Sequence, residues 1–242
     1  MRRFVCTAAL ALFAVLPATA GGRVVLDRPV GGWTEMRAPQ PAHVIAHVRA
    51  GGLVALRTRP FGKVVARVGG MTRFGSQRAL GVVSRRHGRW LAVTEAGVGS
   101  NRAVWVDARA GGLRYSRTAL ELVVDLSSRT LTLKRGAVAV RRVSVGVGAL
   151  NSPTPTGRFA VTDKLDGHRF SAAYGCCILA LSAVQPNLPA GWAGGNRVAI
   201  HGTLSPSDFG NAVSAGCVHA RDSDLRYLMR VVPLGTPVVI RP

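Results

Sequence analysis

Residues 200–219 read IHGTLSPSDFGNAVSAGCVH, which places His201 before one glycine and Cys217 after another. A thiol and an imidazole are the minimum needed for acyl transfer through a thioester, because the imidazole takes the thiol proton and the thiolate attacks a carbonyl. Glycine has no Cβ, so it lets the backbone approach a reacting group closely. The segment therefore predicts Cys217 as a nucleophile and His201 as its base.

Other groups in this segment have candidate roles. The backbone N–H groups of Gly216 and Cys217 are the expected oxyanion donors, and losing one such donor raises the barrier by about 3 kcal/mol in other enzymes. Asp208 is an alternative acid for a triad. His219 is interpreted as a structural or solvent-facing residue rather than as a second base. A lone cysteine can also be inert packing, but Cys217 lies in a polar, glycine-rich loop.

The residues around this segment predict a mostly-β domain with one helix. A hairpin is expected where two apolar runs flank Ser127-Ser128-Arg129. Asp222-Ser223-Asp224 can cap a helix that continues through Leu228. The remaining predicted elements are the hairpin strands 122–126 and 130–134, an alternating stretch 137–147, a rigid proline corner 153–157, and strands 158–162, 197–200 and 238–240.

The first half of the chain predicts a separate small all-β barrel. Its short apolar runs are separated by Gly, Pro and basic turns. They cover residues 53–57, 63–68, 79–84, 90–93 and 103–107. Trp90 and Trp105 are interpreted as core residues rather than as ligand-stacking ones. The barrel is expected to span 44–110, and Gly111-Gly112 to link it to a second domain at 118–242.

The N-terminus predicts export. Met1-Arg2-Arg3 is followed by an apolar run and by Pro17-Ala18-Thr19-Ala20, which is typical of a signal peptide cleaved after Ala20. An uncleaved anchor is the alternative. Residues 1–20 are thus the expected signal peptide and 21–43 a tether, rich in Gly, Pro and Arg. The expected location is the periplasm or cell wall.

The charge predicts polyanionic partners. The chain of 242 residues has 32 Lys and Arg against 11 Asp and Glu, a formal net charge of +21. Such a field attracts anionic polymers. Export and the lack of an aromatic–basic motif argue against a nucleic-acid partner. Anionic wall polymers or lipid head groups are the expected partners, and the oligomeric state stays open.

Four motifs occur in order: VDLS (124–127), PTPTG (153–157), HGT (201–203) and SAGC (214–217). Together they resemble the YkuD-type L,D-transpeptidases of bacterial cell walls, over roughly residues 120–241. The segments 56–60, 88–93 and 104–106 resemble the bacterial SH3-like domain. The fold class implied is mainly β, an SH3-like small barrel followed by a YkuD-type β-sandwich with one or two helices.

The resemblance implies that the substrate is a peptidoglycan tetrapeptide stem. Cys217 would attack the carbonyl at the L-centre of the third residue, D-Ala would leave, and a neighbouring stem amine would form a 3→3 cross-link. Water as acceptor would trim the stem instead. In this family a backbone carbonyl can orient the histidine. Neither a cofactor nor a metal is expected.

The substrate contacts are expected to come from the residues that surround the nucleophile. These are Thr203, Ser214, His219, Arg221 and Tyr174. The sequence departs from the family pattern at Ala215, where a histidine is frequent, at Leu204, where Asn is common, and at His219, where Arg or Asn is usual. These departures bear on how the substrate carboxylate is held.

The other cysteines open rival hypotheses. A bridge between the neighbours Cys176 and Cys177 is strained, so the pair is predicted to be reduced and packed. Alternatively the pair lines the cleft, or one member bridges to Cys217. A zinc site is a second possibility, and an inactive basic wall-binding module is a third. The zinc ligands would come from Cys176, Cys177, His201, Cys217 and His219. A thiol probe is expected to label an active Cys217 quickly at neutral pH.

Overall fold

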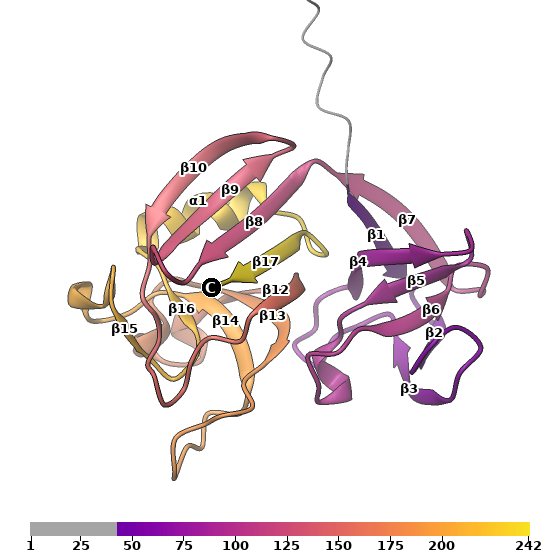
Figure 1. Ribbon diagram of the computed structural model, residues 1–242, viewed down its shortest axis with the longest axis horizontal. Coiled ribbons are helices and arrows are strands. Elements are labelled where there is room, and N and C mark those ends of the chain that lie inside the picture. Colours follow the sequence, from indigo (N-terminus) through magenta and orange to yellow (C-terminus); the bar gives the residue numbers. More distant parts are fainter. Residues whose placement is uncertain (1–42) are drawn as a thin grey trace, which may run out of the picture. The chain divides into compact units, whose positions relative to one another are not determined.

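The computed structural model describes residues 43–242, which belong to one compact unit. The predicted signal peptide and nearly all of the predicted tether lie outside the described residues. Strands dominate, and a single α-helix occurs among the described residues (Figure 1). No helix in the described part of the chain is long and apolar enough to cross a membrane.

The first half of the described chain forms a seven-stranded sheet with the order β3-β2-β6-β5-β4-β1-β7, and its neighbouring strands are antiparallel. The strands are β1 His43–Val48, β2 Leu53–Arg57, β3 Val64–Gly69, β4 Ala79–Arg86, β5 Trp90–Val93, β6 Val104–Asp107 and β7 Leu113–Thr118, with a 3₁₀ turn η1 at Ala96–Val98. Their alternating apolar residues form one core, centred on Leu56, Leu80 and Val93.

The sequence predicted five of these strands and missed β1 and β7. Gly111-Gly112, proposed as a link to the second domain, instead forms the turn between β6 and β7, and β7 pairs with β1 in the same sheet. Trp90 is 3% exposed, in agreement with the core interpretation, whereas Trp105 is only partly buried and is not a core residue. The SH3-like assignment stays a prediction.

The second half forms an eight-stranded sheet with the order β10-β9-β8-β17-β12-β13-β14-β16 and a two-stranded sheet β11-β15. Its strands are β8 Leu120–Asp125, β9 Thr130–Arg135, β10 Val138–Ser144, β11 Val147–Gly148, β12 Gly157–Asp166, β13 Cys177–Val184, β14 Arg197–His201, β15 Ala212–Ser214, β16 Val218–His219 and β17 Pro237–Arg241. The other elements are the helix α1 Asp222–Val231 and the 3₁₀ turns η2 Gly167–Arg169, η3 Ala172–Tyr174 and η4 Pro206–Asp208.

Local chemistry explains the hairpin and the helix. The carboxylate of Asp125 accepts hydrogen bonds from the backbone N–H of Ser128 at 2.9 Å and from the hydroxyl of Ser127 at 2.8 Å, which closes the predicted turn between β8 and β9. Helix α1 is capped by Arg221, one residue before the predicted cap, and no side chain closes that cap. Asp222 and Asp224 lie instead in the first turn, where their negative charges interact favourably with the helix dipole and stabilise the helix.

The two faces of the sheet at β13 and β14 differ in role. Side chains alternate between faces along a strand. Leu179 and Ile200 are fully buried in the main core, which also takes the apolar face of α1. Ile178 and Ala199, on the opposite face, form a small separate apolar cluster. This second face carries the candidate site.

Strand β13 is also tied to the first half of the chain. The side-chain amide of Asn101 bonds both the carbonyl and the N–H of Val184, each at 2.8 Å. The hydroxyls of Thr94 and Ser182 are 2.6 Å apart and buried. These paired bonds hold the strand that underlies the candidate site.

Candidate active site

The register of two parallel strands brings the predicted site residues together. In β14 and β16, Ile200 is opposite Val218 and His201 is opposite His219. Because Ile200 and Val218 point into the main core, His201 and His219 point to the other face. Cys217, one residue before Val218, belongs to that face too and packs against its apolar cluster. The nucleophile and base predicted from the sequence therefore share one face, on neighbouring strands.

His201 is held as a neutral base. Its Nδ1 lies 2.6 Å from the carbonyl oxygen of Gly202. A carbonyl can only accept, so Nδ1 carries the proton and Nε2 presents its lone pair. The residue is 5% exposed. Burial, and secondly the charge of His219, lower the pKa of His201 to about 4.

Tyr174 closes one side of this imidazole. Its ring meets the ring of His201 edge-on, with centroids 4.7 Å apart. It also packs on the apolar cluster that holds Cys217. Burial, and then the nearby Cys217, raise the pKa of the Tyr174 hydroxyl. Among the residues expected to contact substrate, Tyr174 thus lies against both predicted catalytic groups.

Cys217 is the one free cysteine among the described residues. Its Sγ lies 3.9 Å from the carbonyl oxygen of Arg197. Burial raises the pKa of the Cys217 thiol to about 11. Thiol and imidazole are therefore both neutral near pH 7. Rapid labelling by a thiol probe at neutral pH is no longer expected for the free protein, because only the thiolate reacts.

His219 and Asp208 form a second polar group beside His201. His219 Nδ1 lies 2.7 Å from Asp208 Oδ2, and the hydroxyl of Thr203 donates to the same oxygen at 2.6 Å. The rings of His201 and His219 are 4.8 Å apart between centroids. Asp208, a candidate triad acid from the sequence, thus orients His219 rather than His201. Arg221, which was expected to contact substrate, stacks its guanidinium on Phe209, with the guanidinium carbon 4.5 Å from the ring centroid.

The hydroxyl of Ser214 braces the loop that carries Cys217. Ser214 Oγ donates to the carbonyl of Cys217 at 2.6 Å and accepts from the N–H of Gly216 at 3.1 Å. The Gly216 N–H, expected as an oxyanion donor, is therefore engaged within the loop in this structure. Ser214 is 5% exposed, and these contacts make it a residue that shapes the loop.

Gln185 is a residue of the site that the sequence analysis missed. It follows the apolar strand β13 and is 3% exposed. Its Nε2 donates to the carbonyls of Pro153 at 2.8 Å, Ser152 at 3.2 Å and Ala215 at 3.4 Å. The side chain thereby connects the proline corner to the loop of Cys217. A lone polar residue at the end of an apolar run was the only signal for it.

Gly216 is the point where this brace is most sensitive. Its φ is +112°, and a Cβ there would lie 1.9 Å from Gln185 Nε2. We expect Gly216→Ala to lower the free energy of unfolding by about 1–3 kcal/mol, because the amide loses buried hydrogen bonds and the backbone is strained. Acyl transfer should fall at least ~10-fold. Urea unfolding and single-turnover acylation measure these effects.

The matched control for this change is Gly191→Ala. Gly191 also has a positive φ, +76°, but nothing lies within 4 Å of its Cβ position. Gly191→Ala therefore introduces the same kind of backbone strain as Gly216→Ala, but its new Cβ does not collide with another side chain. Equal stability and equal activity of the two variants would show that Gln185 does not brace the loop.

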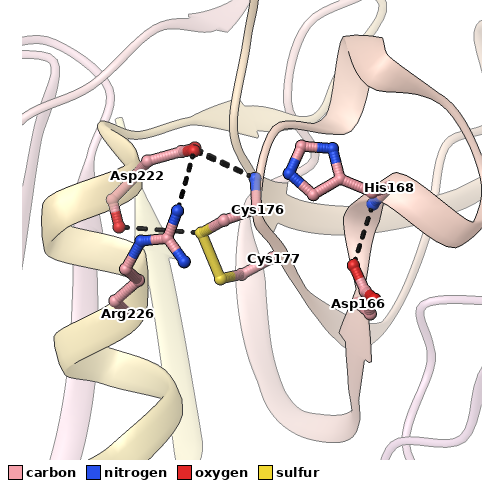
Figure 2. The surroundings of a disulfide bond; sticks show 6 residues. All are labelled: Asp166, His168, Cys176, Cys177, Asp222 and Arg226. Carbon is pink, nitrogen blue, oxygen red and sulfur yellow. Dashed lines mark hydrogen bonds and ion pairs between the residues drawn. A yellow bond between two sulfur atoms is a disulfide. The ribbon is translucent and has the colours of Figure 1, made fainter.

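Cys176 and Cys177 form a disulfide, which corrects the prediction of a reduced pair (Figure 2). Both are buried, as expected of a packed pair. Cys176 lies in the turn before β13, where the side chains of neighbours need not point to opposite faces as they do within a strand. Its N–H donates to the Asp222 carboxylate at 3.1 Å, and its Sγ lies 3.6 Å from the carbonyl oxygen of Asp222.

The disulfide also bears on the zinc hypothesis, because two of its supposed thiolate ligands are used in the bond. Within residues 43–242, no group of three or more His, Cys, Asp or Glu residues is arranged to hold a metal ion. The cleft-lining alternative does not fit either, since Cys176 and Cys177 belong to the main core. A bridge to Cys217 is excluded in this structure, since Cys217 is free.

Comparison with known proteins places this site in a family. The model of the YkuD family, described as the L,D-transpeptidase catalytic domain, matches residues 120–240. The chain belongs to the YkuD family of L,D-transpeptidases. Family members are cysteine-dependent acyltransferases. The matched segment contains every residue of the site described above.

Individual relatives agree with this assignment to the YkuD family. The chain is 31% identical to the YkuD protein of Bacillus licheniformis over 121 residues. This aligned segment makes up 50% of this chain and 65% of the relative. It is 29% identical over 119 residues to YkuD of Bacillus subtilis, covering 49% and 64%. The chain therefore spans just under two thirds of the length of these curated relatives.

Solved structures show likeness at lower identity. An L,D-transpeptidase from Mycobacterium smegmatis is 15% identical and has a TM-score of 0.41, with 67% of this chain and 82% of that chain covered. The assignment to the YkuD family rests on the family match.

Proposed function

We propose that this protein is an exported L,D-transpeptidase that acts on peptidoglycan tetrapeptide stems through a thioester on Cys217. The observation that carries the proposal is the shared face of Cys217 and His201 within the segment matched by the YkuD family. The Nε2 lone pair of His201 supplies the base that a neutral thiol requires.

Acylation follows from the two neutral groups. As the sulfur of Cys217 attacks the stem carbonyl at the L-centre of the third residue, the thiol proton moves to Nε2 of His201. The tetrahedral oxygen gains negative charge, and the N–H of Cys217 is the proposed donor to it. The carbon–nitrogen bond then breaks, the amine of D-Ala takes the proton from His201, and the thioester remains.

Acyl transfer to a second molecule completes the cycle. A side-chain amine of a neighbouring stem gives a 3→3 cross-link, and water gives a trimmed stem. Both acceptors share the same thioester. Tyr174 is proposed to contact substrate, because it packs on the small apolar cluster beside Cys217 and against the ring of His201.

The test is to incubate the protein with tetrapeptide muropeptides and to analyse the products by mass spectrometry. The proposal predicts release of D-Ala, an adduct on Cys217, and dimeric or trimmed stems. Neither D-Ala release nor an adduct, with folded protein, would contradict it and would leave an inactive wall-binding module as the remaining interpretation.

Export and wall attachment complete the proposal. The net charge of +21 supports retention on anionic wall polymers, and the first sheet is the proposed SH3-like spacer or peptide binder. Since added salt screens such attraction, retention on isolated sacculi should fall as sodium chloride is raised from about 0.05 M to about 0.5 M. Retention that does not depend on salt would argue against charge as its cause.

A further inference from the structure

A second imidazole stands beside the catalytic one. His219 lies opposite His201 in the register of β14 and β16, and the two ring centroids are 4.8 Å apart with the ring planes tilted by 51°. Its backbone is fixed by reciprocal hydrogen bonds with Gly146 at 2.8 and 2.9 Å. The backbone of His219 is thus held on one side by pairing with β14 and on the other by a bridge to Gly146.

The carboxylate of Asp208 determines which nitrogen of His219 is available. Asp208 Oδ2 is 2.7 Å from Nδ1. Burial acts to raise the pKa of Asp208, but its hydrogen bonds with Thr203 and His219 and the charges of the two histidines together hold that pKa below its usual value. An ionised carboxylate can only accept, so Nδ1 of neutral His219 carries the proton and Nε2 carries the lone pair. His201 and His219 therefore both have Nδ1 engaged and Nε2 free.

The two imidazoles differ in their access to solvent. His201 is buried, whereas His219 and its partner Asp208 are partly exposed. A second substrate enters from solvent after the first has acylated Cys217. The side chain of His219 contacts the ring of His201 from β14 and the carboxylate of Asp208 from η4, and the same carboxylate oxygen accepts from the hydroxyl of Thr203.

We propose that His219 is the general base for the acceptor half of the reaction, with Asp208 as its positioning residue. This inference rests on the proposed function. His201 then serves acylation, and His219 accepts a proton from the incoming amine. Its buried position against Cys217 and Tyr174 suits His201 to acylation, and the partly exposed His219 is better placed for a group that enters from solvent.

The neutral acceptor amine forms a carbon–nitrogen bond to the thioester carbon, and its extra proton passes to Nε2 of His219. The carbon–sulfur bond breaks, and Cys217 leaves as a thiolate. The proton on His219 then returns to that thiolate, directly or through water, so that both imidazoles and the thiol end neutral. No oxidant, metal or other co-reactant is required.

The test separates the two half-reactions. A tetrapeptide donor whose side-chain amine is acetylated can acylate Cys217 but cannot act as an acceptor. Quenched mass spectrometry then follows adduct gain, and adduct loss after a free amine stem is added. In His219→Gln we expect amine-dependent adduct loss to slow about 10²-fold, in the range for general base catalysis, and adduct gain to change far less.

Three further variants exclude a merely structural role. In His219→Ala, added imidazole should restore part of the amine-dependent step. Asp208→Asn should slow the same step, and Asp208→Glu should recover part of it. His87→Asn, at an exposed turn of the first sheet, is the control and should match wild type in both half-reactions.

The outcomes distinguish the two proposals. If wild type forms no adduct, the proposed function fails and the role of His219 fails with it. If wild type forms the adduct but His219→Gln transfers it normally, or loses both half-reactions equally without imidazole rescue in His219→Ala, then only the assignment of His219 is wrong. Selective, imidazole-rescued loss of adduct transfer supports it.

Discussion

Cys217→Ala is expected to release no D-Ala from a tetrapeptide stem and to gain no adduct mass. The change removes the sulfur on which the proposed thioester forms, so turnover should fall at least ~10⁴-fold. The fold should persist, because Cys217 is partly buried at the edge of a small apolar cluster and alanine keeps the apolar contact. Intact-protein mass spectrometry and D-Ala detection measure the two losses.

Thiol labelling provides the companion measurement. With the pKa of Cys217 at about 11, the thiolate fraction near pH 7 is about 100-fold lower than for a thiol of pKa 9. Iodoacetamide should therefore label the free protein slowly at pH 7 and faster as pH rises. Cys217→Ala is the control, since Cys217 is the one free thiol among residues 43–242. Fast labelling at pH 7 would show that a thiolate–imidazolium pair already exists without substrate.

The elements that the sequence predicted well are those with local signals. The hairpin around Ser127-Ser128-Arg129 appears because Asp125 closes its turn and Arg129 adopts a positive φ of 50°. The strand ending at His201 was expected from its apolar run and its following glycine. The cysteine–histidine pair was expected from residue types alone, and period-two alternation then explains why both reach one face.

The parts that the sequence did not reveal depend on contacts between distant segments. Gln185 braces the loop of Cys217 through carbonyls more than 29 residues away in either direction, and no local pattern encodes that. The pairing of Asp208 with His219 requires the η4 turn to fold back on β16. Strand β13 is buried on both faces, so it lacks the alternation by which strands are recognised.

His201→Gln is expected to slow acylation about 10²–10⁴-fold, because glutamine cannot accept the thiol proton. The same variant should change the acid stability of the fold. The pKa of His201 falls from 6.5 to about 4 on folding, mainly through burial. The unfolded chain therefore binds this proton at a higher pH than the native protein does.

The sign of the effect follows from that order. The stabilising contribution of neutral His201 is complete above pH 6.5 and is lost as pH falls toward 4. Its loss by pH 4 amounts to about 3 kcal/mol in the free energy of unfolding. Wild type should thus lose about 3 kcal/mol more than His201→Gln between pH 7 and pH 4, measured by urea unfolding, and His87→Asn should follow wild type.

The pH dependence of wild-type activity should report the ionisation of the same group, His201. If a neutral His201 is required, the acidic limb of kcat/KM should fall near pH 4 instead of near 6.5, since this profile reports ionisations of the free enzyme. A limb near 6.5, together with equal acid destabilisation of wild type and His201→Gln, would mean that His201 is solvated in solution. The assignment of His201 as a buried base next to Cys217 would then be wrong. The assignment of separate half-reactions to His201 and His219 would be wrong with it.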